Sequence, residues 1–374
     1  MSQTDTLEIK AAVTRSQGAD FVIEHGSVRG PRLDEVRVRV VATGMCHTDM
    51  IIRDQYYPVP LPMVLGHEGA GVVESVGPMV KELKVGDHVV LTYGSCGHCL
   101  QCAKGLSSYC SHFYDMNFGG SGEHGEHALA DANGTALGDH FFAQSSFATY
   151  CIAREGNAIR VSKDAPLELL GPLGCGIQTG AGAVINSLAV RPGSSFVSFG
   201  AGAVGLSAVM AARVVGATII IAVDVVPSRL RLALELGATH VINSKEQDAV
   251  AVIREITGAG TDYALESTGI PAVARQSVDA LAELGCAGIV GASRLGTEVA
   301  FDVNDLLIKG KSIRGICEGD SVPQKFIPDL VNLQMQGRFP IEKLVKFYDL
   351  ADINQAAADS ESGLVLKPIL RMPD

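Results

Sequence analysis

From about residue 177 onward, short apolar runs alternate with longer segments of helical character. The apolar runs predict strands at 195–199, 218–224, 240–242, 262–266, 287–290 and 312–317. Helices are predicted between most of them, at 203–215, 227–236, near 247–256 and near 272–284. Strands that alternate with helices form a parallel sheet covered by helices on both faces. The pattern therefore predicts a doubly wound α/β domain with a six-stranded parallel sheet.

The first 150 residues show a different pattern, in which short β segments are separated by Gly and Pro. Residues 36–40 alternate with period two, and residues 69–77 form a second apolar run that ends in a Gly-Pro turn. Residues 119–139 are rich in Gly, His, Ala and Asp, so we expect a long surface loop. After about residue 318 the mixed character returns. We therefore predict one domain from 1–176 together with 318–374, and a second domain from 177–317.

Composition narrows the function. A chain of 374 residues is too long for one ordinary core, and 47% apolar residues are enough for two folded domains. The net charge of −11, without a basic stripe, argues against a nucleic-acid partner. The first ten residues do not resemble a signal peptide, and the longest uncharged stretch is rich in Gly, so no membrane span is predicted. We expect a cytoplasmic protein that acts on a small molecule.

A glycine motif follows the first strand of the predicted sheet and begins its helix. Gly200 allows a tight turn, Gly202 lets the backbone approach a pyrophosphate, and Gly205 allows close packing of helix and strand. The free N–H groups of the helix N-terminus attract phosphate. The residues predicted to bind a dinucleotide here are Gly200, Gly202, Ala203, Val204 and Gly205.

The end of the next strand indicates which dinucleotide binds. Asp224 lies where a carboxylate accepts hydrogen bonds from adenosine ribose hydroxyls and repels a 2′-phosphate, which favours NAD over NADP. Arg229 is close enough in sequence to pair with Asp224 or to cover the adenine. The alternative interpretation is a packing turn followed by a solvated carboxylate.

Four of the nine cysteines lie close together in the sequence. Their spacing of two, two and seven intervening residues fits a closed four-thiolate zinc site, which has no position open for substrate. Structural zinc contributes roughly 10–16 kcal/mol in small peptides, enough to fix an irregular loop. An iron–sulfur cluster and four free thiols are the alternatives. The predicted ligands are Cys96, Cys99, Cys102 and Cys110.

Three further residues, Cys46, His67 and Cys175, each lie in a glycine-bearing segment. Taken singly, each is an ordinary buried residue. Together with the four-cysteine segment and the glycine motif, in this order, they make the chain resemble the zinc-dependent medium-chain alcohol dehydrogenases over essentially its whole length. Within that family the chain is most similar to the aryl-alcohol (benzyl alcohol) dehydrogenases. This narrower match rests on the general character of the sequence and on residues 360–371.

The resemblance implies a mostly β, GroES-like catalytic domain beside a Rossmann domain, and two zinc ions per chain. It implies that Cys46, His67 and Cys175 hold the catalytic zinc, the known Cys2His set of this family. Asp49 and Glu68 fall on carboxylate positions around that metal; solvated acids are the alternative. The other implied roles are proton acceptance by Thr48, pyrophosphate contact by His47, nicotinamide contact by Thr179 and a second phosphate contact by Lys367.

Two positions bear on the substrate. Tyr93 matches a substrate-pocket position of the family, and Ile51 stands where many members have a proton-relaying His. We hypothesise that His47 or water replaces that relay. The sequence thus predicts an NAD-dependent dehydrogenase of benzyl-type primary alcohols that forms a homo-oligomer, dimer or tetramer. A general aliphatic alcohol dehydrogenase and a non-catalytic NAD-binding protein are the alternatives.

Overall fold

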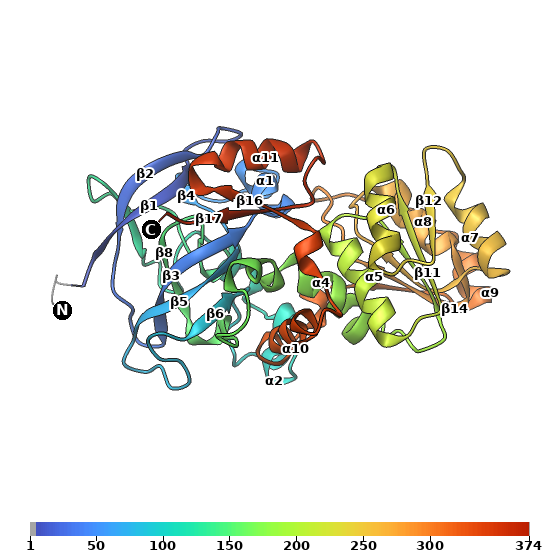
Figure 1. The fold of residues 1–374 in the computed structure, drawn as a ribbon, viewed down its shortest axis with the longest axis horizontal. Coiled ribbons are helices and arrows are strands. Elements are labelled where there is room, and N and C mark those ends of the chain that lie inside the picture. The colour runs from blue at the N-terminus through green and yellow to red at the C-terminus, as the bar shows by residue number, and fades with distance from the viewer. Residues whose placement is uncertain (1–4, 374) are drawn as a thin grey trace. The chain divides into compact units, whose positions relative to one another are not determined.

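The computed structural model describes residues 5–373 and forms two compact units. The first unit ends at Cys175, resumes with Val322–Met335 and continues from Ile341. The second unit comprises Gly176–Ser321 and Gln336–Pro340. Figure 1 shows the first unit drawn from both blue and red parts of the chain, because segments from the two ends of the sequence share it. None of the described helices is long and apolar enough to cross a membrane.

The first unit is built on two sheets. One has the order β4-β1-β2-β7, formed by Met63–Val64, Leu7–Thr14, Val22–Val28 and Leu129–Asp131. The other has the order β16-β17-β3-β5-β6-β9, formed by Val345–Asp349, Lys367–Arg371, Glu35–Gly44, Glu68–Val76, His88–Leu91 and Ala158–Arg160. Strand β8 (Tyr150–Arg154) also pairs with β3. In β3 the buried valines alternate with more polar positions. This alternation explains why the period-two pattern of residues 36–40 predicted a strand here.

In the first unit, helix α1 begins directly after Cys46, and strand β5 begins directly after His67. The helices of this unit are α1 (His47–Arg53), α2 (Leu100–Ala103), α3 (Phe113–Phe118), α10 (Pro323–Met335) and α11 (Ile353–Glu361). The predicted loop 119–139 is partly wrong, because β7 lies within it and pairs with β2. The short run Leu129–Asp131 gains its strand conformation from this long-range pairing, which composition does not reveal.

The second unit is the predicted doubly wound domain. Its six strands are all parallel, in the order β12-β11-β10-β13-β14-β15. They span His240–Asn243, Ile219–Asp224, Ser195–Phe199, Thr261–Glu266, Leu281–Ile289 and Ser312–Gly315. The helices are α4 (Gly176–Gly182), α5 (Ala203–Val215), α6 (Pro227–Leu236), α7 (Ala249–Thr257), α8 (Pro271–Asp279) and α9 (Val303–Lys309). The sequence order reverses beside β10, where such sheets bind their ligands.

One helix boundary was predicted wrongly. The helix expected near 272–284 ends at Asp279, and Leu281 already pairs with Thr261 as the start of β14. A register shift between Thr261 and Tyr263 accompanies this early start. Residues 280–284 are good helix formers, but pairing with β13 overrides their local preference.

Candidate metal centres and active site

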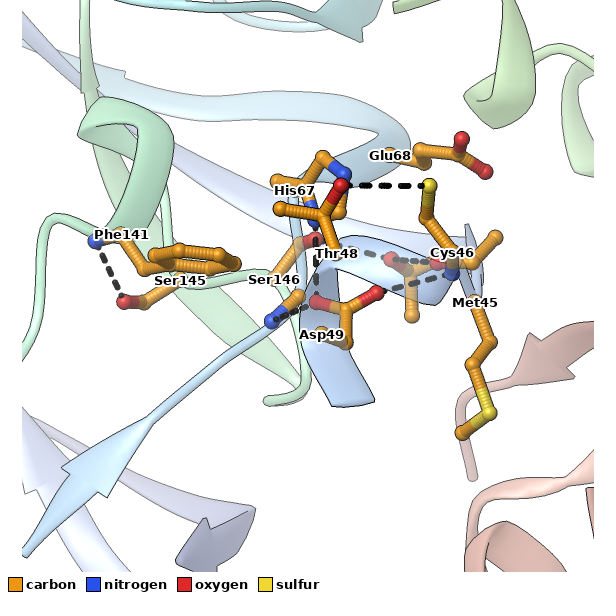
Figure 2. Close-up of polar contacts among 12 residues, drawn as sticks. Met45, Cys46, Thr48, Asp49, His67, Glu68, Phe141, Ser145 and Ser146 are labelled. Atoms are coloured by element: carbon orange, nitrogen blue, oxygen red, sulfur yellow. Dashed lines mark hydrogen bonds and ion pairs between the residues drawn. The ribbon is translucent and has the colours of Figure 1, made fainter. Parts of the chain in front are cut away.

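The buried carboxylate of Asp49 connects two segments of the first candidate metal centre. One oxygen accepts a hydrogen bond from the backbone N–H of Cys46 at 2.8 Å, which holds the start of α1. The other lies 2.9 Å from Nδ1 of His67 and also accepts the N–H of Gly66 (Figure 2). Because a carboxylate at neutral pH only accepts, Nδ1 of His67 is the donor. Nε2 of His67 therefore carries the free lone pair.

Four side chains converge where that lone pair lies. The ligand atoms of Cys46, His67, Glu68 and Cys175 all lie within 4.8 Å of one another. Nε2 of His67 is buried and has no hydrogen-bond partner in the described part of the chain. Two sulfurs and one imidazole nitrogen are a donor set typical of zinc. An oriented, unpartnered nitrogen beside two thiols therefore fits a zinc ion.

The electrostatic surroundings also suit a cation. The contact with Cys175 lowers the pKa of the Cys46 thiol well below its usual value, despite its burial. For His67, burial lowers the pKa, but Asp49 and Cys46 outweigh it and the pKa lies well above its usual value. The thiolate of Cys46 and the carboxylate of Asp49 thus favour positive charge at this position, and a metal ion bound to Nε2 in place of a proton would supply it.

Lys367 forms a buried ion pair beside this first candidate metal centre. Its side chain is buried, with Nζ 2.8 Å from Oε1 of Glu68 and 3.2 Å from the carbonyl oxygen of Met45. Burial lowers the pKa of Lys367, but Glu68 and Cys46 outweigh it, so the ammonium stays charged. Burial also raises the pKa of Glu68. This ion pair holds Lys367 beside the predicted zinc ligands, and a phosphate contact by Lys367 stays a prediction.

The other predicted residues of α1 differ in exposure. Thr48 is half-buried, and its hydroxyl lies 3.8 Å from the sulfur of Cys46. Figure 2 draws this contact. His47 is exposed, whereas Ile51 is buried one turn further along the same helix. The helix thus places a hydroxyl beside the candidate ligand, an imidazole in solvent and an apolar side chain in the interior.

Aromatic side chains that the sequence reasoning missed lie against His67. The ring of Phe142 stacks on His67 with centroids 4.5 Å apart, and Phe141 meets it edge-on at 5.3 Å. Four residues of this turn have positive φ, a strained conformation that turns both rings toward His67: His140, Phe142, Ala143 and Ser145. The hydroxyl of Ser145 accepts the N–H of Phe141 (Figure 2). Only the adjacent Phe pair could have signalled this turn.

The aromatic contacts continue from this turn to α3 and Tyr93. Phe118 lies 5.2 Å from Phe142, and Phe113 lies 6.5 Å from it. Tyr93, the predicted pocket residue, is buried, packs against Phe113 at 5.8 Å and shares a 2.8 Å hydrogen bond with the hydroxyl of Ser107. We call the five rings of Phe141, Phe142, Phe118, Phe113 and Tyr93 the aromatic wall.

The four clustered cysteines form a second candidate metal centre, as their spacing predicts. Their sulfurs lie within 4.8 Å of one another, with Cys96–Cys102 and Cys99–Cys110 each at 4.0 Å. Backbone N–H groups also point at the sulfurs, and they lower the pKa of Cys99 to about 5. Four thiols at these separations fit one tetrahedral zinc ion.

In the second unit, the glycine motif forms the turn between β10 and α5. Gly200 has φ +99°, and a Cβ on Gly205 would lie 1.9 Å from the carbonyl oxygen of Gly200, so both positions require glycine. Nothing lies within 4 Å of a Cβ built on Gly202, at the N-cap of α5 (Ala203 and Val204 form its first turn). The backbone there is open to a close ligand.

The remaining predicted coenzyme residues also lie in the second unit. Asp224 ends β11 and accepts the N–H of Ala201 in the glycine turn at 2.7 Å. Arg229 lies on α6 and is half-buried. The hydroxyl of Thr179 lies 3.4 Å from the carboxylate of Glu318, a residue the sequence reasoning did not single out. The structure thus places Asp224 against the glycine turn and Thr179 against Glu318.

A six-stranded parallel sheet with a glycine turn, together with a β unit carrying a Cys2His cluster and a four-cysteine cluster, defines a metal-dependent dehydrogenase. Two family models match the chain: the alcohol dehydrogenase GroES-like domain over residues 32–163, and the zinc-binding dehydrogenase over residues 203–334. The chain belongs to the zinc-dependent medium-chain alcohol dehydrogenases. This confirms the family and the fold class predicted from the sequence.

Individual relatives match along the whole chain. A geraniol dehydrogenase of Castellaniella defragrans is 45% identical over 98% of both chains. The crystal structure of benzyl alcohol dehydrogenase from Acinetobacter calcoaceticus is 61% identical, with a TM-score of 0.96, covering 98% of this chain and 100% of that one. An alcohol dehydrogenase zinc-binding domain protein from Burkholderia ambifaria is 71% identical, with a TM-score of 0.98, covering 99% and 100%.

Proposed function

We propose that this protein interconverts benzyl-type primary alcohols and their aldehydes with NAD+ and NADH. In this proposal Cys46, His67 and Cys175 hold a catalytic zinc, and the four clustered cysteines hold a structural zinc. Membership of the alcohol dehydrogenase family supports the reaction class. The similarity to a benzyl alcohol dehydrogenase supports the substrate class.

The observation that carries the substrate class is the aromatic wall. Its rings pack against the predicted zinc ligand His67, and we infer that a substrate oxygen bound at the zinc brings an aromatic carbon skeleton close to them. Aromatic pairs gain about 0.5–1.5 kcal/mol beyond the burial of their area. A polyol has no such gain, and it would leave its other hydroxyl groups without hydrogen bonds against these rings.

A zinc ion bound at this site would lower the pKa of an alcohol hydroxyl, as it lowers that of water from 15.7 to about 7, and would polarise an aldehyde carbonyl. Asp49 fixes Nε2 of His67 toward the ion. Thr48, with its hydroxyl 3.8 Å from the Cys46 sulfur, accepts the substrate proton at Oγ1. Beside the ligands, the positive charge of Lys367 neutralises the negative charge of Glu68.

The choice of NAD rests on Asp224. Its carboxylate stands at the end of β11 against the glycine turn, where a ribose 2′-phosphate would meet a negative charge. The open backbone at Gly202 and the N-terminus of α5 supply the phosphate contacts. Thr179 contacts the nicotinamide, and Arg229 covers the adenine or pairs with Asp224.

The proton must then reach solvent without a histidine at position 51. We assign this step to His47, because it is exposed and adjoins Thr48 in sequence. In His47→Arg the guanidinium stays protonated and cannot pass the proton on, so the pH dependence of kcat should change. An unchanged profile together with unchanged NAD+ affinity would remove both roles of His47.

The decisive measurement follows NADH absorbance with NAD+ and a panel of benzyl alcohol, geraniol, ethanol, sorbitol and S-hydroxymethylglutathione. Zinc content is measured in parallel, before and after chelation. We expect the highest kcat/KM for benzyl alcohol and its loss when the zinc is removed. A preference for ethanol or sorbitol would refute the substrate argument but leave the reaction class standing. NAD+ binding without oxidation of any alcohol would favour the non-catalytic alternative.

A further inference from the structure

Two exposed histidines lie beside the four-cysteine cluster and take no part in the function proposed above. The rings of His98 and His112 have centroids 6.4 Å apart and are inclined by 39°. One ring nitrogen of each lies within 4.8 Å of the Cys96 sulfur and of the other. Cys96 is therefore common to two groups of metal-ligating side chains.

One of the two rings is already oriented. Nδ1 of His98 lies 2.8 Å from the carbonyl oxygen of Cys96. A carbonyl oxygen only accepts, so Nδ1 carries the hydrogen and Nε2 retains its lone pair. Metal-binding histidines commonly donate their other N–H to a backbone carbonyl in this way.

The charge at this position favours a second cation. A zinc ion with four thiolates carries a net charge of −2, and this charge lies at the ligands themselves. Thiolate and imidazole are both donors that suit zinc and its close chemical relatives. A thiolate sulfur has enough lone pairs to bind two ions, so Cys96 need not leave the first one.

An ion can also reach the position from solvent. Cys96, His112 and Asp115 line the same groove of the first unit. Asp115 lies three residues beyond His112, in the first turn of α3.

We propose that His98, His112 and the Cys96 sulfur form a third metal site, for a zinc-class divalent ion, that shares Cys96 with the four-thiolate zinc. The inference rests on the proposed structural zinc. The site has three protein ligands and leaves a fourth position for water. Since its histidines are exposed and its thiolate is shared, the third ion binds reversibly and more weakly than the other two.

The test is a titration of the full chain with Co2+, after zinc analysis has established two ions per chain. We expect one further equivalent of Co2+ to bind, with a sulfur-to-cobalt charge-transfer band. His98→Ala and His112→Ala should each weaken this binding by about tenfold or more, since a lost ligand matters more than the second-sphere partners whose loss costs roughly 10–100-fold. Both variants should retain two zinc ions, which would show that the four-cysteine cluster is intact.

The matched control is His25→Ala, an exposed histidine on β2 outside every ligand group of the described residues, and it should bind the third ion unchanged. The proposal is overturned if no third equivalent binds, if both histidine variants retain it, or if the charge-transfer band is missing. A protein whose four clustered cysteines hold no zinc would instead refute the four-thiolate site, and the third site would fall with it.

Discussion

At the scale of single residues, Asp49 determines the geometry of the Cys2His cluster. Its two oxygens bind the backbone N–H groups of Cys46 and Gly66 and the ring of His67. Two chain segments that each carry one predicted zinc ligand are therefore tied to one carboxylate. The cluster depends on this residue although it contributes no ligand atom of its own.

Replacing Asp49 with Asn should weaken metal binding with little change in side-chain volume. An amide offers only one acceptor oxygen, so one of the N–H donors at the site loses its partner and the negative charge behind His67 disappears. We expect zinc affinity to fall by about 10–100-fold, measured as zinc retained against a competing chelator. Asp54→Asn, at the C-terminal end of the same helix and paired with Arg53, is the control and should keep its zinc. Equal zinc retention in the two variants would contradict this role.

The aromatic wall yields a prediction for specificity. Phe142→Leu removes the ring stacked on His67 but keeps an apolar side chain of similar size. The ratio of kcat/KM for benzyl alcohol to that for ethanol should fall by about twofold to tenfold, because an aromatic contact of roughly 0.5–1.5 kcal/mol is lost. Phe347→Leu, on β16, leaves every ring of the wall in place and should not change the ratio. If the ratio stays constant in Phe142→Leu, Phe142 does not contact the substrate.

At the scale of elements, α9 is attached to the second unit by a buried lysine. The Lys311 side chain is fully buried, and its ammonium binds Asp305 of α9 at 2.7 Å and the carbonyl oxygen of Val278 in α8. Lys309 also binds Asp305, and the two lysines lower the pKa of that carboxyl to about 2. The short helix α9 has no fully buried residue; its partly buried Leu306 packs against the core of the second unit, and this ion pair adds a polar attachment.

Asp305→Asn should destabilise the second unit by about 2 kcal/mol, because it leaves a buried ammonium without its counter-ion; part of the cost is relieved since Asp305 itself is partly exposed. The folded pKa lies below the ordinary value of 3.8, so the wild-type advantage is complete above that pH and is lost as pH falls toward 2. Urea unfolding at neutral and acidic pH measures the loss of stability and its dependence on pH. Asp329→Asn, which breaks the exposed pair with Lys325, should cost less than about 1 kcal/mol. Equal effects of the two variants would contradict the assignment.

The elements also show what the sequence could predict. Strands β10 and β11 and helices α5 and α6 were found to within a residue, because each combines clear periodicity with a local signal such as the glycine turn or Pro227. The early start of β14 and the short strand β7 depend on pairing partners far away in the chain. The ion pair of Lys367 with Glu68 and the stacking of Phe142 on His67 depend on folding in the same way. Spacing predicted the four-cysteine cluster and the family resemblance pointed to Cys46, His67 and Cys175, but neither could reveal these contacts.

At the scale of the whole molecule, the second unit exposes apolar side chains near an unpaired sheet edge. Strand β15 is the last strand of its sheet and is exposed along its length. Val303, Leu307 and Ile308 of α9 are 73%, 75% and 80% exposed. Exposed apolar residues and an open strand edge are typical of surfaces that associate with another copy. They support our prediction of a homo-oligomer.

Ile308→Glu should lower the molar mass in solution, because a carboxylate at an apolar contact loses its hydration when the copies meet. Light scattering over a range of protein concentrations measures the effect. Leu364→Glu, at a similarly exposed position of the first unit, is the control and should leave the mass unchanged. A wild-type protein that is monomeric throughout that range would refute the homo-oligomer.

The divided first unit has a consequence for synthesis. Glu68 and Lys367 are 299 residues apart, and β17, which carries Lys367, is hydrogen-bonded to β3. Both segments of the second unit, Gly176–Ser321 and Gln336–Pro340, are synthesised before β17, so we expect this unit to complete its fold first. Until β17 arrives, the carboxylate of Glu68 lacks its ammonium, and residues 42–44 of β3 lack this strand partner. The nascent chain is therefore most exposed to misassembly, and most dependent on chaperones, after Glu68 has been synthesised and before Lys367 has.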